Sequence, residues 1–430
     1  MSASEVTAEA TAVHVNLRDS QSVLQEEVIA SLELNKVDYA MERKKSLRAR
    51  YYFGIIFLIM NLVAWFFRDY GHSVLPFIHY IKVCGSEGDD CFHSLGVLRV
   101  SLGCYIFFSV MFLTTVKTRK LCEHRNWWHS GWWEVKSVLL IVSMALPFFF
   151  PSEIVQIYGE VARIGAGIFL LLQLVSVIHF ITWWTKYWTP EEERKQRCSL
   201  GLLMSTLFYV ASICGIVYLY ESYASRISCS LNLFFITWTV ILLAAMMVIS
   251  LNSKESWLLT LFSFVGVQSE EMVYLQRSPS WNFSEPATIR CETKNHEKGN
   301  SGWIIILGFL IAIFAIVMAA FSTGIDSKCF QFSNNKVEHE DDIPYSYGFF
   351  HMVFSLGAMY FAMLFISWDL NNSARKWSID VGWISTWVKV INEWFAATIY
   401  IWMLISPVVR QNKVMDNNGT VQETADSVMA

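Results

Sequence analysis

The sequence predicts an all-α fold, a polytopic integral membrane bundle of about ten transmembrane helices, from three observations. Of its 430 residues, 54% are hydrophobic and only 16% are charged, whereas soluble domains carry roughly 25% charged residues. Nine apolar runs each come close to the ~20 residues that cross hydrocarbon as a helix. No polar segment between them is long enough to bury a sizeable core of its own.

The nine clear spans divide the chain into three parts. A polar N-terminal segment, 1–50, precedes a multi-pass domain, 51–408, and a tail, 409–430, follows it. No cleavage-site pattern follows the first run, so we expect it to be retained as a span. In chain order the runs are 51–67, 97–116, 132–150, 164–184, 199–220, 227–251, 302–323, 347–368 and 387–408.

A tenth run, 257–267, is too short to cross the membrane alone. Eleven residues extend only ~16 Å as a helix, and Glu270 and Glu271 would have to enter the bilayer to complete a crossing. We expect an atypical seventh helix at 257–275. A re-entrant or cavity-lining segment is the alternative, because it exposes less polar backbone and charge to lipid. Whether this segment crosses decides on which side of the membrane the C-terminus lies.

Charge placement predicts a cytosolic N-terminus. Five basic residues crowd positions 43–50, whereas Arg68 and Lys82 in the next loop face four acidic residues. The loops after the second and fourth runs are again basic, as the positive-inside rule requires of cytosolic loops. Four tryptophans around the start of the third run are typical interfacial anchors: Trp127, Trp128, Trp132 and Trp133.

Covalent modification is expected on the lumenal side. Cys84 and Cys91 lie together in the first lumenal loop, in a compartment where disulfides persist. A bridge between them is our prediction, with unpaired thiols or pairing of either with Cys291 as alternatives. Asn282 and Asn371 stand in glycosylation sequons and would report which loops are lumenal.

Ionisable residues within spans are the candidates for function, because each is costly in lipid. Arg99, Glu134 and Lys136 lie near the edge of a run, where we expect them to extend towards the headgroups.

Glu160 and Arg163, with Gln173 deeper in the fourth span, share one helix. We expect Gly167, on the face of Glu160 and Arg163, to let another helix approach closely. These residues either form a structural network between helices or line a polar groove.

The last span holds a second candidate pair. Lys389 and Glu393 are four apart, so they can pair on one helix face, line a cavity or bind a headgroup. His179 and His351 are isolated in apolar surroundings, and we interpret them as hydrogen-bonded interior groups rather than metal ligands.

Motifs of enzyme chemistry are missing from the sequence. It has no nucleophile elbow, no phosphate-binding glycine loop and no repeated acidic motif for magnesium. His124 and His129 form a single His-x4-His spacing without a second such cluster. We therefore predict a protein that is not an enzyme, holds no metal or cofactor and does not bind nucleic acid.

Several segments resemble the Serinc family, also called TDE or TMS membrane proteins, in a version most like plant members. The resemblance covers about residues 45–410. The segments that carry it are 61–71, 99–101, 131–136, 168–174, 229–232, 345–354, 358–363, 387–394 and 400–403.

The resemblance implies two helical bundles around a long, tilted fourth helix, which fits the run 153–184. It also implies a carrier-like protein of the endomembrane system or plasma membrane. Such a protein would assist serine incorporation into phosphatidylserine and sphingolipids, or move phospholipids between leaflets. Membrane phospholipids are the expected partners. A serine or small-solute transporter and a scaffold for lipid-synthesis enzymes are the rival functions, and a homo-oligomer is left open.

Two departures from the family pattern stand out. His179 replaces an acidic residue late in the fourth helix, which leaves that carboxylate without a counterpart here. Residues 261–283 replace the rest of a full seventh span. A splice form or gene-model error explains the intact signatures on both sides, and a divergent short or broken helix is the rival.

Overall fold

The structure, a computed structural model, describes the larger part of the predicted membrane domain. The atypical segment 257–275, Cys84, the side chain of Cys91, Asn282 and Asn371 lie outside the described residues. The described residues are 36, 38–70, 88–188, 206–207, 210, 213–217, 220, 230–252, 302–325, 342–368, 370, 387–399 and 401–402.

The described residues form helices, joined at one point by an isolated antiparallel bridge between Lys120 and Asp342. Five helices are long and apolar enough to cross a membrane, or six if the bent pair α3–α4 counts as one span. The predicted membrane helical bundle is confirmed, and the number of ten spans stays a prediction. The helices are the first helix Asp38–Tyr70, α2 Gly88–Thr115, α3 His124–Ser130, α4 Trp133–Ala145 with the 3-10 turn η2 Leu146–Phe149, α5 Ser152–Trp188, α7 Ser230–Asn252, α9 Gly302–Ile325, α10 Tyr347–Phe365 and 387–399.

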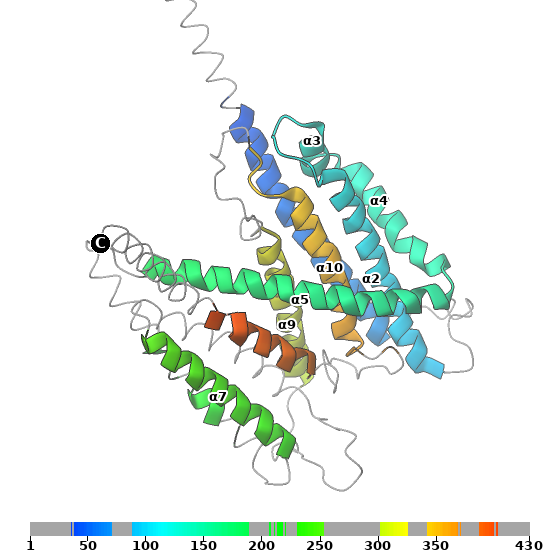
Figure 1. Ribbon diagram of the computed structural model, residues 1–430. Helices are drawn as coiled ribbons and strands as arrows, with labels where there is room; N and C mark the ends of the chain where they lie inside the picture. Colours follow the sequence, from blue (N-terminus) through cyan, green and yellow to red (C-terminus); the bar gives the residue numbers. More distant parts are fainter. Residues whose placement is uncertain are drawn as a thin grey trace, which may run out of the picture.

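Helix α10 is the centre of the larger bundle, surrounded by the first helix, α2, α5 and α9 (Figure 1). Nearly all of its side chains are buried, as expected for a helix that is apolar on every side. The ring centroids of Phe350 and Phe354 lie 4.5 Å apart in a tilted arrangement, and the ring of Phe57 of the first helix lies 4.9 Å from that of Phe354. Aromatic pairs at these distances add to the free energy gained by burial.

Two glycines permit the closest helix approaches to α10. A Cβ atom at Gly165 of α5 would collide with Met359 Sδ, and one at Gly348 would lie 2.6 Å from Val116 Cα. At Gly167, by contrast, no atom of the described residues lies within 4 Å of where its Cβ would be. None of the described helices therefore meets the expectation for Gly167, because α5 turns its Gly165 side towards α10.

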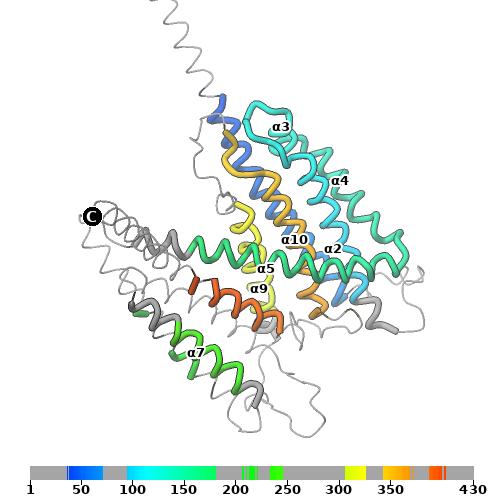
Figure 2. The backbone as a smooth tube through the Cα atoms, viewed as in Figure 1, coloured from blue at the N-terminus to red at the C-terminus, as the bar shows by residue number. Residues whose placement is uncertain are grey.

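Helix α5 is the long, tilted fourth helix that was expected. Its 37 residues extend about 55 Å, and it runs across the other helices of the bundle (Figures 1 and 2). Val155, Ala162 and Phe169 are buried, whereas Ile157 and Ile164 are 65% and 69% exposed. A 55 Å helix fits within ~30 Å of hydrocarbon only if it tilts strongly or protrudes.

A second, smaller group of helices lies on the other side of α5 from α3 and α4 (Figure 2). It consists of α7 and the helix 387–399, which are joined by edge-to-face contacts between aromatic rings. Phe235 meets Trp387 at 5.7 Å, and Trp238 meets Trp394 at 6.2 Å. The long helix α5 thus separates two groups of helices, as the family resemblance implied.

Candidate functional site

The C-terminal end of α10 is a strained turn held by two arginines. The backbone N–H of Ser367 bonds Leu364 O and that of Trp368 bonds Met363 O, which is the Schellman pattern of a helix end. Ser367 and Trp368 have φ angles of 55° and 62°, where L residues other than glycine cost about 1–3 kcal/mol each. Something must therefore stabilise this turn.

Both arginines donate to carbonyl groups of that turn. Arg68 Nη1 donates to Phe365 O and Arg163 Nη2 donates to Trp368 O, each at 3.1 Å. The last carbonyls of a helix lack helical partners and carry partial negative charge. Cationic donors from the first helix and from α5 therefore complement the end of α10.

Arg68 belongs to a fully buried ion pair. Its Nε lies 2.7 Å from Asp69 Oδ1, the two side chains are 2% and 1% exposed, and Trp65 Nε1 donates to Asp69 Oδ2 at 2.7 Å. The end of the first apolar run at residue 67 predicts that both residues lie in the following loop, but the first helix continues to Tyr70. The spacing of four between Trp65 and Asp69 was the available signal, because it places the indole beside the carboxylate on one helix face.

Arg163 belongs to the predicted pair with Glu160, which is only partly buried. Arg163 Nη1 contacts the Glu160 carboxylate at 2.8 and 3.1 Å, and the two side chains are 34% and 61% exposed. Ile157, Val161 and Ile164 around them are 65%, 49% and 69% exposed. The ion pair therefore lies on an otherwise apolar face of α5.

Gln173 lies ten residues beyond Arg163 on α5, about 15 Å along the helix. Its Oε1 atom is buried without a hydrogen-bond partner in the part of the chain that the structure describes. An unsatisfied buried carbonyl costs about 1–3 kcal/mol, so a ligand or water that donates to this atom would be stabilised.

Lys389 and Glu393 lie in the second group of helices. Both are half-buried on the helix 387–399, and the Thr239 side chain of α7 hydrogen-bonds Glu393. Pairing of Lys389 with Glu393 stays a prediction. The five candidates thus fall into two sets: Glu160, Arg163 and Gln173 along α5, and Lys389 and Glu393 on the helix 387–399.

The opposite end of α10 carries a buried, uncharged network that we did not predict. His129 Nδ1 lies 3.1 Å from His351 Nε2, and His129 Nε2 lies 2.9 Å from the Tyr345 hydroxyl. Tyr345 in turn donates to Ser46 O at 3.3 Å. Burial raises the pKa of the Tyr345 hydroxyl well above its ordinary value, so the phenol stays protonated and remains a donor.

The proton positions of this network follow from Tyr345. Its single proton goes to Ser46 O, so its oxygen accepts from His129 Nε2–H, and His129 Nδ1 then accepts from His351 Nε2–H. The interpretation of His351 as a hydrogen-bonded interior group is confirmed. His179, in contrast, is exposed.

A second pair of bonds joins the same three elements. Tyr347 at the start of α10 donates to Asn126 Oδ1 of α3 at 2.9 Å, and its hydroxyl lies 2.6 Å from Ser46 Oγ of the first helix. All of these side chains are buried. Tyr347 therefore ties together the first helix, α3 and α10.

Arg99 and Lys136 are buried, at 3% and 1% exposure, so the expectation that they extend to the headgroups is wrong. Arg99 Nη1 donates to Pro147 O and Phe150 O, and Lys136 Nζ donates to His129 O at 2.8 Å and Gly131 O at 2.6 Å. The reason is that short helical segments end beside both residues and leave carbonyls without partners.

Comparison with known proteins identifies the family. The family model described as Serine incorporator (Serinc) matches residues 31–342 and 331–413. The chain belongs to the Serinc family. Serinc relatives include Serine incorporator 3 of Mus musculus, 24% identical over 76% of this chain and 82% of that protein. A probable serine incorporator of Dictyostelium discoideum is 26% identical over 87% of this chain and 96% of that protein. Membrane protein TMS1 of Saccharomyces cerevisiae is 23% identical over 86% of this chain and 90% of that protein.

Membership of the Serinc family agrees with the helices described above. The protein is a multi-pass integral membrane protein, and its relatives are named as incorporators rather than as enzymes. The matches extend over both Arg68 and the pair Glu160–Arg163, so both sides of the α10 turn lie within the family region.

Proposed function

We propose that this Serinc protein assists the movement of phospholipids between leaflets without catalysing a covalent reaction, and that headgroups pass along α5. The observation that carries the proposal is the exposed ion pair Glu160–Arg163, which lies on an apolar face. Its guanidinium suits a phosphate and its carboxylate suits an ammonium group. The pair thus offers both charges that a zwitterionic headgroup needs.

The energetic argument concerns charge in hydrocarbon. An ion in the bilayer is costly unless it meets water, a partner or a headgroup. Arg163 has two partners within the chain, the Glu160 carboxylate and Trp368 O. The Glu160 side chain nevertheless remains more than half exposed. A headgroup or water beside this pair would supply the missing hydrogen bonds.

Polar groups extend from the pair along the rest of α5. Among the described residues Gln173 Oε1 is buried without a hydrogen-bond partner, and His179 is exposed. From Glu160 to His179 the helix rises about 28 Å along its own axis, and because α5 runs across the other helices, this rise covers a smaller depth of the membrane (Figure 1). A headgroup that follows α5 therefore meets further polar side chains beyond the ion pair, while its acyl chains remain in lipid.

The test is lipid transfer by the purified protein in reconstituted vesicles. We expect the double variant Glu160→Gln/Arg163→Gln to slow transfer of fluorescent phospholipids by roughly 5- to 30-fold, which corresponds to a loss of about 1–2 kcal/mol. Glu153→Gln, an exposed acid at the start of the same helix, is the matched control and should transfer normally. Normal transfer by a well-folded double variant would contradict the proposal.

A second candidate function follows from the names of the relatives, which are serine incorporators. Under it, the protein would bind serine or recruit lipid-synthesis enzymes in an endomembrane or the plasma membrane. Purified wild-type protein would then transfer no phospholipid. Saturable serine uptake into the vesicles would indicate a transporter, whereas co-purification with synthesis enzymes would indicate a scaffold.

A further inference from the structure

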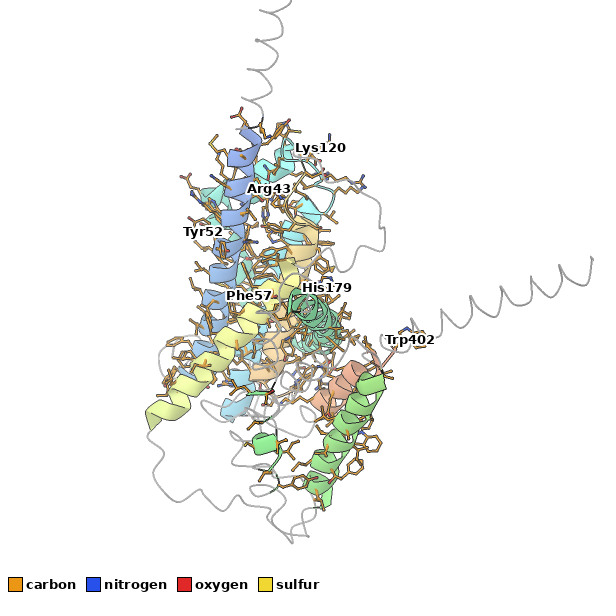
Figure 3. The ribbon with its side chains drawn as sticks, turned by 90° about the vertical axis from the view of Figure 1, so that its left-hand side faces the viewer. Arg43, Tyr52, Phe57, Lys120, His179 and Trp402 are labelled. Carbon is orange, nitrogen blue, oxygen red and sulfur yellow. The ribbon has the colours of Figure 1, made fainter. Side chains whose placement is uncertain are left out.

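The end of the molecule at which the first helix begins carries exposed cations from three separate segments. In Figure 3, Arg43 of the first helix and Lys120 of the loop after α2 lie at this same end. The third segment is α3. The exposed basic side chains are Arg43, Lys44, Lys45, Arg48, Lys117, Arg119, Lys120 and Arg125, and we call them the basic surface.

Hydrogen bonds hold the segments of the basic surface together. Asn126 of α3 donates to Glu42 Oε2 of the first helix at 3.4 Å, and Ile343 N donates to Arg119 O at 3.2 Å. Tyr347 links Asn126 with Ser46, as described above. The three segments are therefore fixed relative to one another before any ligand arrives.

The acidic side chains beside the basic surface are partly neutralised within the chain. Glu42 pairs with Lys45 at 2.7 Å. Glu123 Oε1 accepts the backbone N–H groups of Arg119 and Lys120, each at 3.1 Å. Within the part of the chain that the structure describes, they and Asp38 and Asp342 are four acids against eight exposed bases, so this part of the surface carries an excess of positive charge.

Helix α3 lies at the level expected of lipid headgroups. Its axis makes an angle of 68° with that of the helix that runs through α4 and η2. When that apolar helix stands near the membrane normal, α3 therefore lies close to the membrane plane. Trp127 and Trp132 are 58% and 62% exposed, and exposed tryptophans favour the interface between headgroups and hydrocarbon.

Each of the two Trp-Trp pairs has one half-buried ring and one exposed ring. Trp128 Nε1 donates to Thr114 Oγ1 at 3.0 Å, and the Trp133 ring lies 4.3 Å from Lys136 Nζ. The left-handed conformation of Trp132, with φ 56°, occurs at the break between α3 and α4. Trp127 and Trp132 are thus left on the surface by the packing of their neighbours.

We propose that the basic surface binds the anionic headgroups of phospholipids in the leaflet that α3 faces. Basic side chains beside a membrane attract anionic lipids through their charge, and the exposed tryptophans set the depth of this end of the protein in the membrane. This site is distinct from Glu160–Arg163 and does not depend on the proposed lipid transfer.

The test measures lipid binding to the full-length purified protein in detergent by native mass spectrometry, with phosphatidylglycerol as the anionic probe and phosphatidylcholine as the neutral one. We expect wild-type protein to prefer phosphatidylglycerol, and the preference to fall with added salt. The variant Arg43→Gln/Arg48→Gln/Arg119→Gln/Arg125→Gln should lose it by roughly tenfold or more. The matched variant with Lys at the same four positions should keep it.

Four results would overturn the proposal. One is equal binding of both lipids by wild-type protein at low salt, a measurement that needs no variant. The second is an unchanged preference in the Gln variant, and the third is an equal loss of preference in the Lys variant. The fourth is tight binding of a poly-glutamate peptide without preference for phosphatidylglycerol, which would assign the surface to an acidic protein partner instead.

Discussion

The two ends of α10 are stabilised by opposite means. At its N-terminal end, Tyr345, Tyr347 and His351 make uncharged hydrogen bonds with side chains that are themselves buried. At its C-terminal end, Arg68 and Arg163 bind the last carbonyls as members of ion pairs. The first end is buried, with His351 Nδ1 left without a hydrogen-bond partner among the described residues, whereas the second end reaches the exposed face of α5.

The difference indicates which end serves structure and which serves function. Satisfied buried hydrogen bonds specify one arrangement of helices, and the bonds of Tyr347 with Asn126 and Ser46 hold three elements in that way. At the other end, Arg68 is buried but Arg163 is 34% exposed. One arginine therefore fixes the turn after α10, and the other also remains accessible to a ligand.

The largest effect is expected from Arg68→Ala at the charged end. Removal of this side chain leaves Asp69 as a buried charge without its cation, which typically costs about 3–5 kcal/mol. Thermal unfolding in detergent measures the loss. The double variant Arg68→Met/Asp69→Leu removes both charges and should recover most of it, so a double variant as unstable as Arg68→Ala would show that the carbonyl contact matters more than the charge.

A smaller effect is expected from His351→Phe at the uncharged end. The Phe ring occupies similar space but cannot donate to His129 Nδ1, and an unsatisfied buried acceptor costs about 1–3 kcal/mol. The unfolding temperature should fall, while His179→Phe on the exposed side of α5 should leave it nearly unchanged. Equal behaviour of the two variants would mean that the histidine contact contributes nothing to stability.

The smallest effect, of opposite sign, is expected from Ser367→Gly. Glycine adopts positive φ without steric cost and is the usual residue at this position of a Schellman motif. Stability should rise by about 0.5–1 kcal/mol, measured by the same unfolding experiment. A decrease would show that the Ser367 side chain, rather than its backbone, stabilises the turn.

Sequence patterns predicted the features that depend on local spacing. Apolar runs near the thickness of hydrocarbon predict spans, and the spacing of three between Glu160 and Arg163 places their side chains on one face, as the structure confirms. The length of α5 followed from the family resemblance and from one long run. These are properties of a helix considered by itself.

Contacts between distant segments could not be predicted in this way. His129 and His351 are separated by 222 positions, and hydropathy carries no information about such a meeting. The burial of Arg99 and Lys136 also depended on carbonyls exposed at the ends of other helical segments. A charge near the edge of a run can bind either headgroups or such carbonyls, and the sequence does not distinguish them.

The sequence by itself therefore determined that this protein is a helical membrane protein of the Serinc pattern, with a charged pair on its long helix. Only the tertiary structure decided how each helix is rotated about its axis. It turned Gly165 rather than Gly167 towards α10 and enclosed Arg68 while leaving Glu160 exposed. The physical reason is that transfer into lipid depends on composition, whereas rotation depends on the packing of several neighbouring helices at once.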